Sequence, residues 1–190
     1  MSKNLCLAAI AACFLAAAPA SAQSVTEKLA PCLACHGETG TSQNENVPSL
    51  GGQNSYYLLI QLVLLRDKIR VGLPMNDLLK GVSDGDLQAF ADTIAKLPPP
   101  KPAAGGDAAR MEKAKTLAHQ NHCDACHRLD FAGTENVPRI GAQREDYLLK
   151  TLRDYKSGAR HGYDASMADV LAPLGDADFI ELAYYLAHSR

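Results

Sequence analysis

The chain has 190 residues, and its 19 lysines and arginines stand against 21 aspartates and glutamates, which gives a net charge of −2. Proteins that bind nucleic acid or an anionic lipid surface carry a clear excess of basic residues, so this composition argues against both kinds of partner. Beyond the N-terminal 22 residues, no stretch of the sequence is long and apolar enough to predict a membrane span.

Residues 1–22 have the pattern of a secretory signal peptide. A basic residue, Lys3, precedes an apolar run over residues 5–18, and a small-residue cleavage pattern ends at Ala22. The pattern predicts an exported protein, most simply in a bacterial periplasm. The alternative is a lipid anchor, because the residues that end at Cys13 resemble a lipoprotein motif.

Two copies of Cys-x-x-Cys-His, at residues 32–36 and 123–127, account for every cysteine outside the leader. Two thiols three positions apart lie on one face of a helix, where each can form a thioether to a vinyl group of haem, and the histidine then points at the iron. A bare Cys-x-x-Cys also occurs in dithiol redox pairs and in zinc sites, and these are the alternatives. The pattern predicts two covalently attached haem c groups. The attachment residues are Cys32, Cys35, Cys123 and Cys126, and the axial histidines are His36 and His127.

The same order of features occurs twice along the chain. Residues 46–53 (NVPSLGGQ) match residues 136–143 (NVPRIGAQ) at an offset of 90, and a Tyr-Leu pair at residue 57 recurs at residue 147 with the same offset. The chain is therefore interpreted as a duplication, in which each half carries its own haem.

Proline and glycine mark a linker over residues 98–107, between the two copies. Its composition is typical of a stiff proline run followed by a flexible hinge. The predicted domains are residues 23–97 and residues 108–190.

Each half is predicted to be helical, and no segment alternates as a strand would, so the expected fold class is all-α. A capping-box pattern, Ser24 with Glu27, opens the first helix. Gly158 is the expected C-cap of a helix in the second half. The expected helices begin near residues 24 and 108, cover about residues 56–70 and 145–156, and cover residues 84–97 and 176 to about 188.

Methionine is the expected second axial ligand, because a thioether opposite an imidazole favours ferrous iron and raises the reduction potential. Met75 and Met167 occupy equivalent places, in predicted loops before the last helix of each half. Met111 has no counterpart and lies on a helical apolar stripe, so it is predicted to be a core residue. For the second haem, His161 is the alternative ligand.

Duplicated prolines and tyrosines are further candidates. Pro48 and Pro138 follow their haem histidines by 12 and 11 residues. A carbonyl at that place can accept the Nδ1–H of the imidazole and fix its orientation, although both residues could also be ordinary loop prolines. Tyr57 and Tyr147 either hydrogen-bond a haem propionate or the other domain, or simply pack at a helix start.

Together these motifs resemble the diheme cytochrome c4 family, which has tandem class I cytochrome c domains. The resemblance rests on both haem motifs, the Asn-Val-Pro and Gly-x-Gln segments, the Tyr-Leu helix starts and the pair Met75 and Met167. It implies two domains, each wrapped around one haem with His–Met coordination, and haems that face each other near the domain interface. It also implies an electron carrier rather than an enzyme, with respiratory complexes such as terminal oxidases as partners.

Two other functions stay open from the sequence. Similar tandem domains occur as the cytochrome subunit of sulfide and thiosulfate dehydrogenases. A diheme peroxidase needs one iron with an exchangeable position, and methionines at both equivalent places argue against it. The unusually apolar segment 56–70 departs from the common family pattern and suggests a docking face for a partner subunit or a closely packed domain interface.

Overall fold

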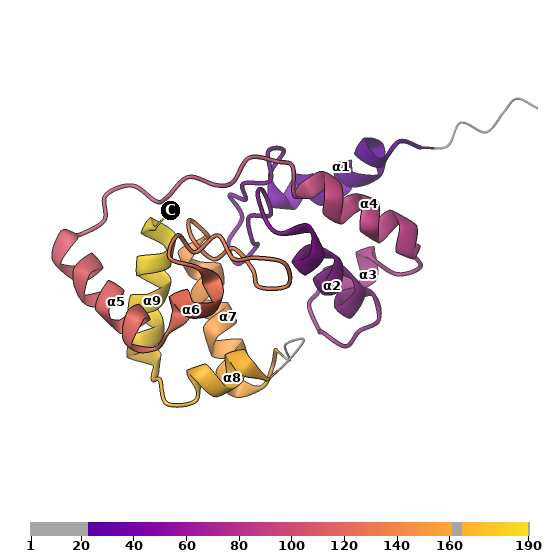
Figure 1. The fold of residues 1–190 in the computed structure, drawn as a ribbon. Helices are drawn as coiled ribbons and strands as arrows, with labels where there is room; N and C mark the ends of the chain where they lie inside the picture. Colours follow the sequence, from indigo (N-terminus) through magenta and orange to yellow (C-terminus); the bar gives the residue numbers. More distant parts are fainter. Residues whose placement is uncertain (1–22, 161–164, 190) are drawn as a thin grey trace, which may run out of the picture.

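The computed structural model describes residues 23–160 and 165–189, and the regular elements of this part of the chain are α-helices (Figure 1). One isolated bridge joins Thr134 and Val137. The predicted all-α class is confirmed. The predicted signal peptide, with Cys13, and the alternative ligand His161 lie outside the described residues.

The first half forms one group of helices, drawn from indigo to magenta in Figure 1. α4 packs against α1 and α2, and the short α3 packs against α2. Their buried side chains form a hydrophobic core that includes Leu29, Leu58, Leu87 and Phe90. The bounds are α1 Val25–His36, α2 Ser55–Arg66, α3 Met75–Leu78 and α4 Asp84–Ile94.

The second half forms a separate group around α9 (Figure 1). α9 packs against α5 and α7, and its side chains Phe179, Leu182 and Ala183 lie at the centre of a second core, which also includes Phe131. The bounds are α5 Ala108–Gln120, α6 Cys123–His127, α7 Glu145–Ser157, α8 Ser166–Leu171 and α9 Asp176–His188.

Local signals in the sequence explain where several helices begin and end. The predicted capping box is present at α1, where the Ser24 hydroxyl accepts from the backbone of Glu27 and the Glu27 carboxylate accepts from the backbone of Ser24. Ser83 caps α4 in the same way through the backbone N–H of Asp86. α7 ends at Gly158, which takes a left-handed conformation with φ of 74°.

Two helices are shorter than the sequence indicated. α2 ends at Arg66 rather than near residue 70, because Lys68 takes a positive φ of 58° that a helix cannot continue through. α4 ends at Ile94 rather than at Leu97, and tight turns complete the segment before Pro98. A residue that precedes proline is disfavoured in helical conformation, which explains the early end of α4.

The linker at residues 98–107, whose composition predicted a stiff proline run followed by a flexible hinge, contacts both halves of the molecule. The backbone N–H of Ala103 donates to the carbonyl of Ala187 in α9, at 2.9 Å. The opposite end of the linker contacts the first half, since a Cβ at Gly51 would lie 2.2 Å from the carbonyl oxygen of Pro98. The linker is therefore held on both halves of the molecule.

A reciprocal pair of glutamines joins the two halves. Gln53 Nε2 donates to the carbonyl of Arg139 at 3.0 Å, and the backbone N–H of Arg139 donates to Gln53 Oε1 at 2.7 Å. Gln143 makes the same two bonds to the backbone of Ser49, at 2.8 and 2.9 Å. The offset of 90 that relates the two copies also relates these two pairs, so the interface resembles that of a symmetric dimer.

We expect replacement of either interface glutamine to destabilise the protein markedly. Gln143→Ala leaves a buried backbone donor and acceptor of Ser49 without partners, and each unsatisfied group costs about 1–3 kcal/mol. The free energy of unfolding, measured by denaturant titration with far-UV circular dichroism, should fall by about 2 kcal/mol or more. The control is Gln88→Ala, on the exposed side of α4. Equal losses in the two variants would contradict the role of Gln143.

Candidate functional site

The first Cys-x-x-Cys-His motif lies at the C-terminal end of α1. Cys32 is partly buried and packs against the first core, Cys35 is exposed, and His36 is buried with 5% of its surface exposed. The helix ends here because Gly37 takes a positive φ of 86°, and a Cβ on Gly37 would lie 2.1 Å from the carbonyl oxygen of Thr41. The motif is therefore presented at a sharp turn of the chain.

The second motif forms its own short helix, α6. His122 has a left-handed conformation, with φ of 52°, and separates α6 from α5. Cys123 is partly buried and Cys126 is exposed, as in the first motif, and His127 is buried with 5% exposure. Both copies therefore place the first thiol inward and bury the histidine.

A proline carbonyl orients each motif histidine. His36 Nδ1 lies 2.8 Å from the carbonyl oxygen of Pro48. His127 Nδ1 lies 2.9 Å from the carbonyl oxygen of Pro138. Since a carbonyl can only accept, Nδ1 carries the proton and Nε2 keeps the lone pair, which is the form of imidazole that binds a metal.

Burial also keeps these histidines neutral. Burial lowers the pKa of His36, and the Pro48 carbonyl opposes the shift only in part. The pKa of His127 is lowered for the same reason, against the opposing effect of Pro138. A neutral imidazole can serve as an iron ligand, whereas an imidazolium has no free lone pair.

The cysteines do not fit the two alternative readings of Cys-x-x-Cys. Burial raises the pKa of Cys32 and raises that of Cys123 to about 11, whereas a reactive dithiol pair needs a lowered thiol pKa. A zinc site needs further ligands, and within residues 23–160 and 165–189 no group of three or more His, Cys, Asp or Glu side chains is placed to hold a metal ion. The donor set fits covalent attachment of haem.

Each candidate methionine packs against the same core as the first cysteine of its half. Met75 begins α3 and contacts the first core, as Cys32 does. Met167 lies in α8 and contacts the second core, as Cys123 does. Both methionines were expected in loops and instead lie in short helices. Met111, the expected core residue, also packs against the second core from α5.

A buried asparagine that the sequence did not single out holds the chain next to Met75. Asn76 Nδ2 donates to the carbonyls of Leu65 and Arg70, at 2.6 and 2.9 Å, and Asn76 Oδ1 accepts from the backbone of Gly72 at 2.7 Å. The second half has alanine at the equivalent place, so the comparison of the two repeats contains no signal for this residue.

A cluster of tyrosine and arginine side chains lies between the two halves. Tyr57 OH accepts from Arg160 Nη2 at 2.9 Å. Tyr147 OH accepts from Arg160 Nη1 at 3.2 Å and from Arg70 Nη2 at 3.3 Å. The two tyrosines were candidates from the sequence, whereas the arginines were missed, although the repeat offset of 90 relates Arg70 to Arg160.

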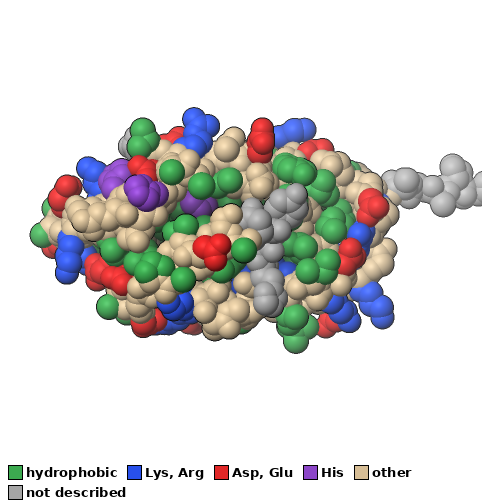
Figure 2. Space-filling model, turned by 60° about the horizontal axis from the view of Figure 1, so that its bottom comes forward, with side chains coloured by type: hydrophobic (Ala, Val, Ile, Leu, Met, Phe, Trp, Pro, Cys, Tyr) green, Lys and Arg blue, Asp and Glu red, His purple; other side chains and the backbone are tan. Residues whose placement is uncertain are grey.

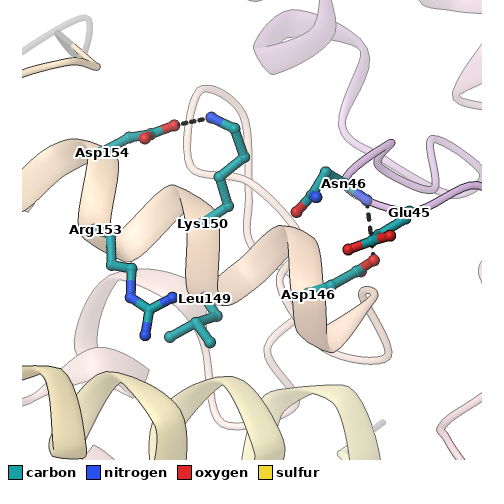
Figure 3. A pocket seen from close by; sticks show the side chains of 7 residues that line it. All are labelled: Glu45, Asn46, Asp146, Leu149, Lys150, Arg153 and Asp154. Atoms are coloured by element: carbon teal, nitrogen blue, oxygen red, sulfur yellow. Dashed lines mark hydrogen bonds and ion pairs between the residues drawn. The ribbon is translucent and has the colours of Figure 1, made fainter.

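The surface recess in Figure 3 is formed by the loop of Asn46 and by α7, and it contains no residue of either Cys-x-x-Cys-His motif. Its charged side chains are of both signs. The backbone N–H of Asn46 donates to Asp146 Oδ2 at 2.9 Å, and Lys150 pairs with Asp154. This recess belongs to the contact between the two halves.

Comparison with known proteins identifies the family. The cytochrome c family model matches residues 111–190. Over its length the chain is 32% identical to cytochrome c4 of Pseudomonas aeruginosa, with 90% of each chain covered. The chain belongs to the cytochrome c4 family. It is also 30% identical to the thiosulfate dehydrogenase electron acceptor of Thiomonas intermedia, over 98% of this chain and 91% of that protein.

A solved structure agrees with this assignment. Reduced cytochrome c4 from Pseudomonas stutzeri is 28% identical and superposes with a TM-score of 0.79, over 87% of this chain and 97% of that one. As a member of the cytochrome c4 family, the chain is a diheme electron-transfer protein rather than an enzyme, and it carries two covalently attached haem c groups. None of its described helices is long and apolar enough to span a membrane.

Proposed function

We propose that this chain is an exported electron carrier in which each haem iron is held between a histidine and a methionine of its own half. The ligands are His36 and Met75 in residues 23–97, and His127 and Met167 in residues 108–190. The observation that carries the proposal is the hydrogen bond from each histidine to a proline carbonyl, which leaves Nε2 for iron in both halves. The packing of each methionine on the same core as the attachment cysteine supports the pairing.

The residues of this protein supply attachment and orientation. When bound, each haem supplies an iron that changes between the ferrous and ferric states. The Cys-x-x-Cys thiols tether the group, and the carbonyls of Pro48 and Pro138 hold the imidazoles in one orientation. His36 with Met75, and His127 with Met167, are the residues that would hold the two irons; with both side chains bound, neither iron would have a free position for a substrate, and little would rearrange on oxidation or reduction.

The place of action and the partner are further parts of the proposal. The signal-peptide pattern of residues 1–22 supports a periplasmic location. Terminal oxidases and other respiratory complexes are the main partner class. Similarity to the thiosulfate dehydrogenase electron acceptor supports a second candidate function, in which the chain accepts electrons as the cytochrome subunit of a dehydrogenase.

The apolar segment 56–70 was predicted to be a docking face for a partner. Within α2, only a small part of this segment is exposed enough to serve as such a face. α2 uses Leu58 and Leu65 in the core, and Tyr56 is its large apolar side chain with the most exposure. Large exposed apolar side chains continue beyond α2. On the face drawn in Figure 2, hydrophobic side chains lie among polar and charged groups. Those that follow α2 are Ile69, Val71, Leu73 and Leu78.

The visible and near-infrared spectrum of the purified protein, with a haem count per chain, tests the ligand assignment. We expect two haems per chain and the methionine–ferric charge-transfer band at the intensity of two His–Met irons. A band of half intensity would mean that one iron lacks its methionine, and His161 would become the candidate ligand in the second half. Rapid binding of cyanide or carbon monoxide to the native protein would favour a peroxidase-like site instead.

A further inference from the structure

A histidine–carboxylate pair lies at the second Cys-x-x-Cys-His motif. Nδ1 of His119, at the C-terminal end of α5, lies 2.7 Å from Oδ2 of Asp124. Asp124 stands between Cys123 and Cys126, so attachment of haem to these two thiols would fix the carboxylate beside the haem. The pair is separate from the axial ligands and from the proline carbonyls that orient the histidines.

The break between α5 and α6 brings the two side chains together. His122 takes a left-handed conformation, and its backbone N–H donates to the carbonyl of His119 at 3.0 Å. The chain therefore turns here instead of continuing as one helix, and α6 packs against α5 with Asp124 in its first turn. The side chain of Asp124 is 19% exposed and that of His119 is 42% exposed. The carboxylate is thus partly buried, whereas water can exchange protons with the imidazole.

The charge of the pair depends on one nitrogen. An ionised carboxylate can only accept a hydrogen bond, so Nδ1 of His119 carries a proton, and Nε2 is the nitrogen that gains or loses one. Histidine is the side chain that changes charge near neutral pH. When Nε2 is protonated, the imidazolium balances the charge of Asp124. When Nε2 is not protonated, the carboxylate is an uncompensated negative charge.

Among the described residues, Asp124 is the charged group that is paired with His119. Lys115 lies one turn earlier on α5 and pairs with Glu112. His122 is exposed and contributes a second imidazole near the turn. The acidic side chains of α9, which also packs against α5, have other partners. These partners are Arg153 for Asp176, the backbone N–H of Gly175 for Asp178, and Arg110 for Glu181.

The first half has no equivalent pair. When the two motifs are aligned on their cysteines, Lys28 stands where His119 does. Leu33 stands where Asp124 does, so an attachment motif does not need a carboxylate at this place. Lys28 pairs with Asp86 of α4 at 2.7 Å, and a lysine keeps its charge near neutral pH. The titratable pair is therefore a feature of the second haem site alone.

We propose that Asp124 and His119 tune the reduction potential of the second haem and make it depend on pH, a device that the first haem lacks. This inference rests on the proposed function, since it needs a haem attached at Cys123 and Cys126. Ferric haem carries one more positive charge than ferrous haem, so an uncompensated carboxylate nearby favours ferric iron and lowers the potential. Protonation of His119 cancels this effect. The midpoint potential of the second haem therefore falls as rising pH removes the proton.

Redox titrations of the holoprotein from about pH 5 to about pH 8, the range in which histidine changes charge, test the pair. His119→Gln leaves the carboxylate uncompensated, so one of the two midpoints should lie below that of the wild type at acid pH and match it at alkaline pH. The other midpoint should not change. His122 and the haem carboxylates are present in both proteins, so any pH dependence that they cause cancels in the comparison.

The control is another histidine of the second half. His188 lies beside Gly106, before the opposite end of α5, and its Nδ1 donates to the carbonyl of Tyr184 at 2.8 Å. In His188→Gln both midpoints should follow those of the wild type at every pH. Curves for His119→Gln that coincide with those of the wild type would overturn the proposal.

Asp124→Asn tests the carboxylate itself. This variant should raise the same midpoint at every pH, and by more than Asp130→Asn does. Asp130 lies as far after His127 in the sequence as Asp124 lies before it, but its side chain is 59% exposed, so water and salt screen its charge more effectively. Equal shifts in the two variants would contradict the assigned role of Asp124.

Proton binding to His119 provides an independent readout. By linkage, a proton that favours ferrous haem binds more tightly to the ferrous protein than to the ferric protein. NMR titration of the His119 imidazole, identified by its absence in His119→Gln, should show a several-fold difference in proton affinity between the two states. Equal affinities would overturn the proposal. The haem count and the methionine–ferric band, recorded on the same samples, report separately on the proposed function.

Discussion

Met167→Ala is expected to lower the midpoint potential of one haem by on the order of 100 mV or more, because axial ligands set haem potentials over a range of about 0.8 V. On the proposed assignment, the variant loses the thioether that would favour ferrous iron. An iron without this ligand would be open to carbon monoxide, which should bind to one iron of the reduced variant. Met75→Ala should do the same to the other iron. Redox titration and carbon monoxide difference spectra measure both effects.

Met111→Ala is the matched control for these variants. Met111 packs against the second core, as Met167 does, so its truncation should destabilise the fold without opening an iron to ligands. A Met167 variant with an unchanged potential and no carbon monoxide binding would refute the assignment, and His161 would then be the candidate ligand in the second half.

Gly133→Ala is expected to disrupt the second haem site more than any single side-chain truncation on the surface. Gly133 has a positive φ of 65°, and a Cβ there would lie 2.3 Å from the carbonyl oxygen of Val137 and 2.4 Å from that of Pro138. The Pro138 carbonyl would have to move, and it accepts from His127. We expect the free energy of unfolding to fall by roughly 3 kcal/mol or more, since the left-handed conformation alone costs an alanine about 1–2 kcal/mol.

Comparison with Gly158→Ala separates the two causes of the expected loss of stability in Gly133→Ala, which are the steric clash of the added Cβ and the cost of the left-handed conformation. Gly158 has a similar positive φ of 74°, but an added Cβ would meet nothing within 4 Å. Its replacement should therefore cost only about 1–2 kcal/mol. Denaturant unfolding measures both variants, and the methionine–ferric band reports on the iron. Equal losses of stability, with unchanged spectra, would show that the Pro138 carbonyl tolerates the added methyl group.

Much of the fold can be predicted from local signals in the sequence. The capping box at Ser24, the left-handed Gly158 and the bounds of α9 follow from short stretches of sequence, because helix ends are decided by hydrogen bonds within a few residues. The family also followed from the sequence, since covalent attachment of haem requires cysteine and histidine at one fixed spacing, and the chain repeats that spacing.

The features that the sequence did not predict depend on contacts between segments that are distant in the sequence. The composition of the linker predicts a proline run and a hinge, but it does not predict the hydrogen bond from Ala103 to Ala187 of α9, because no local pattern encodes a bond to a residue so distant in the sequence. The early end of α2, the short helices that carry Met75 and Met167, and the role of Asn76 likewise depend on packing between elements.

The sequence alone determined the chemistry of this protein, and the tertiary structure decided how its two halves meet. Thioether attachment and histidine ligation depend on residue types at fixed spacing, which can be read directly. The burial of Arg160 beside Tyr57 and Tyr147 depends on how two separately packed cores bring their equivalent turns together. The energy of a buried charge is set by everything around it, and only the three-dimensional arrangement contains that information.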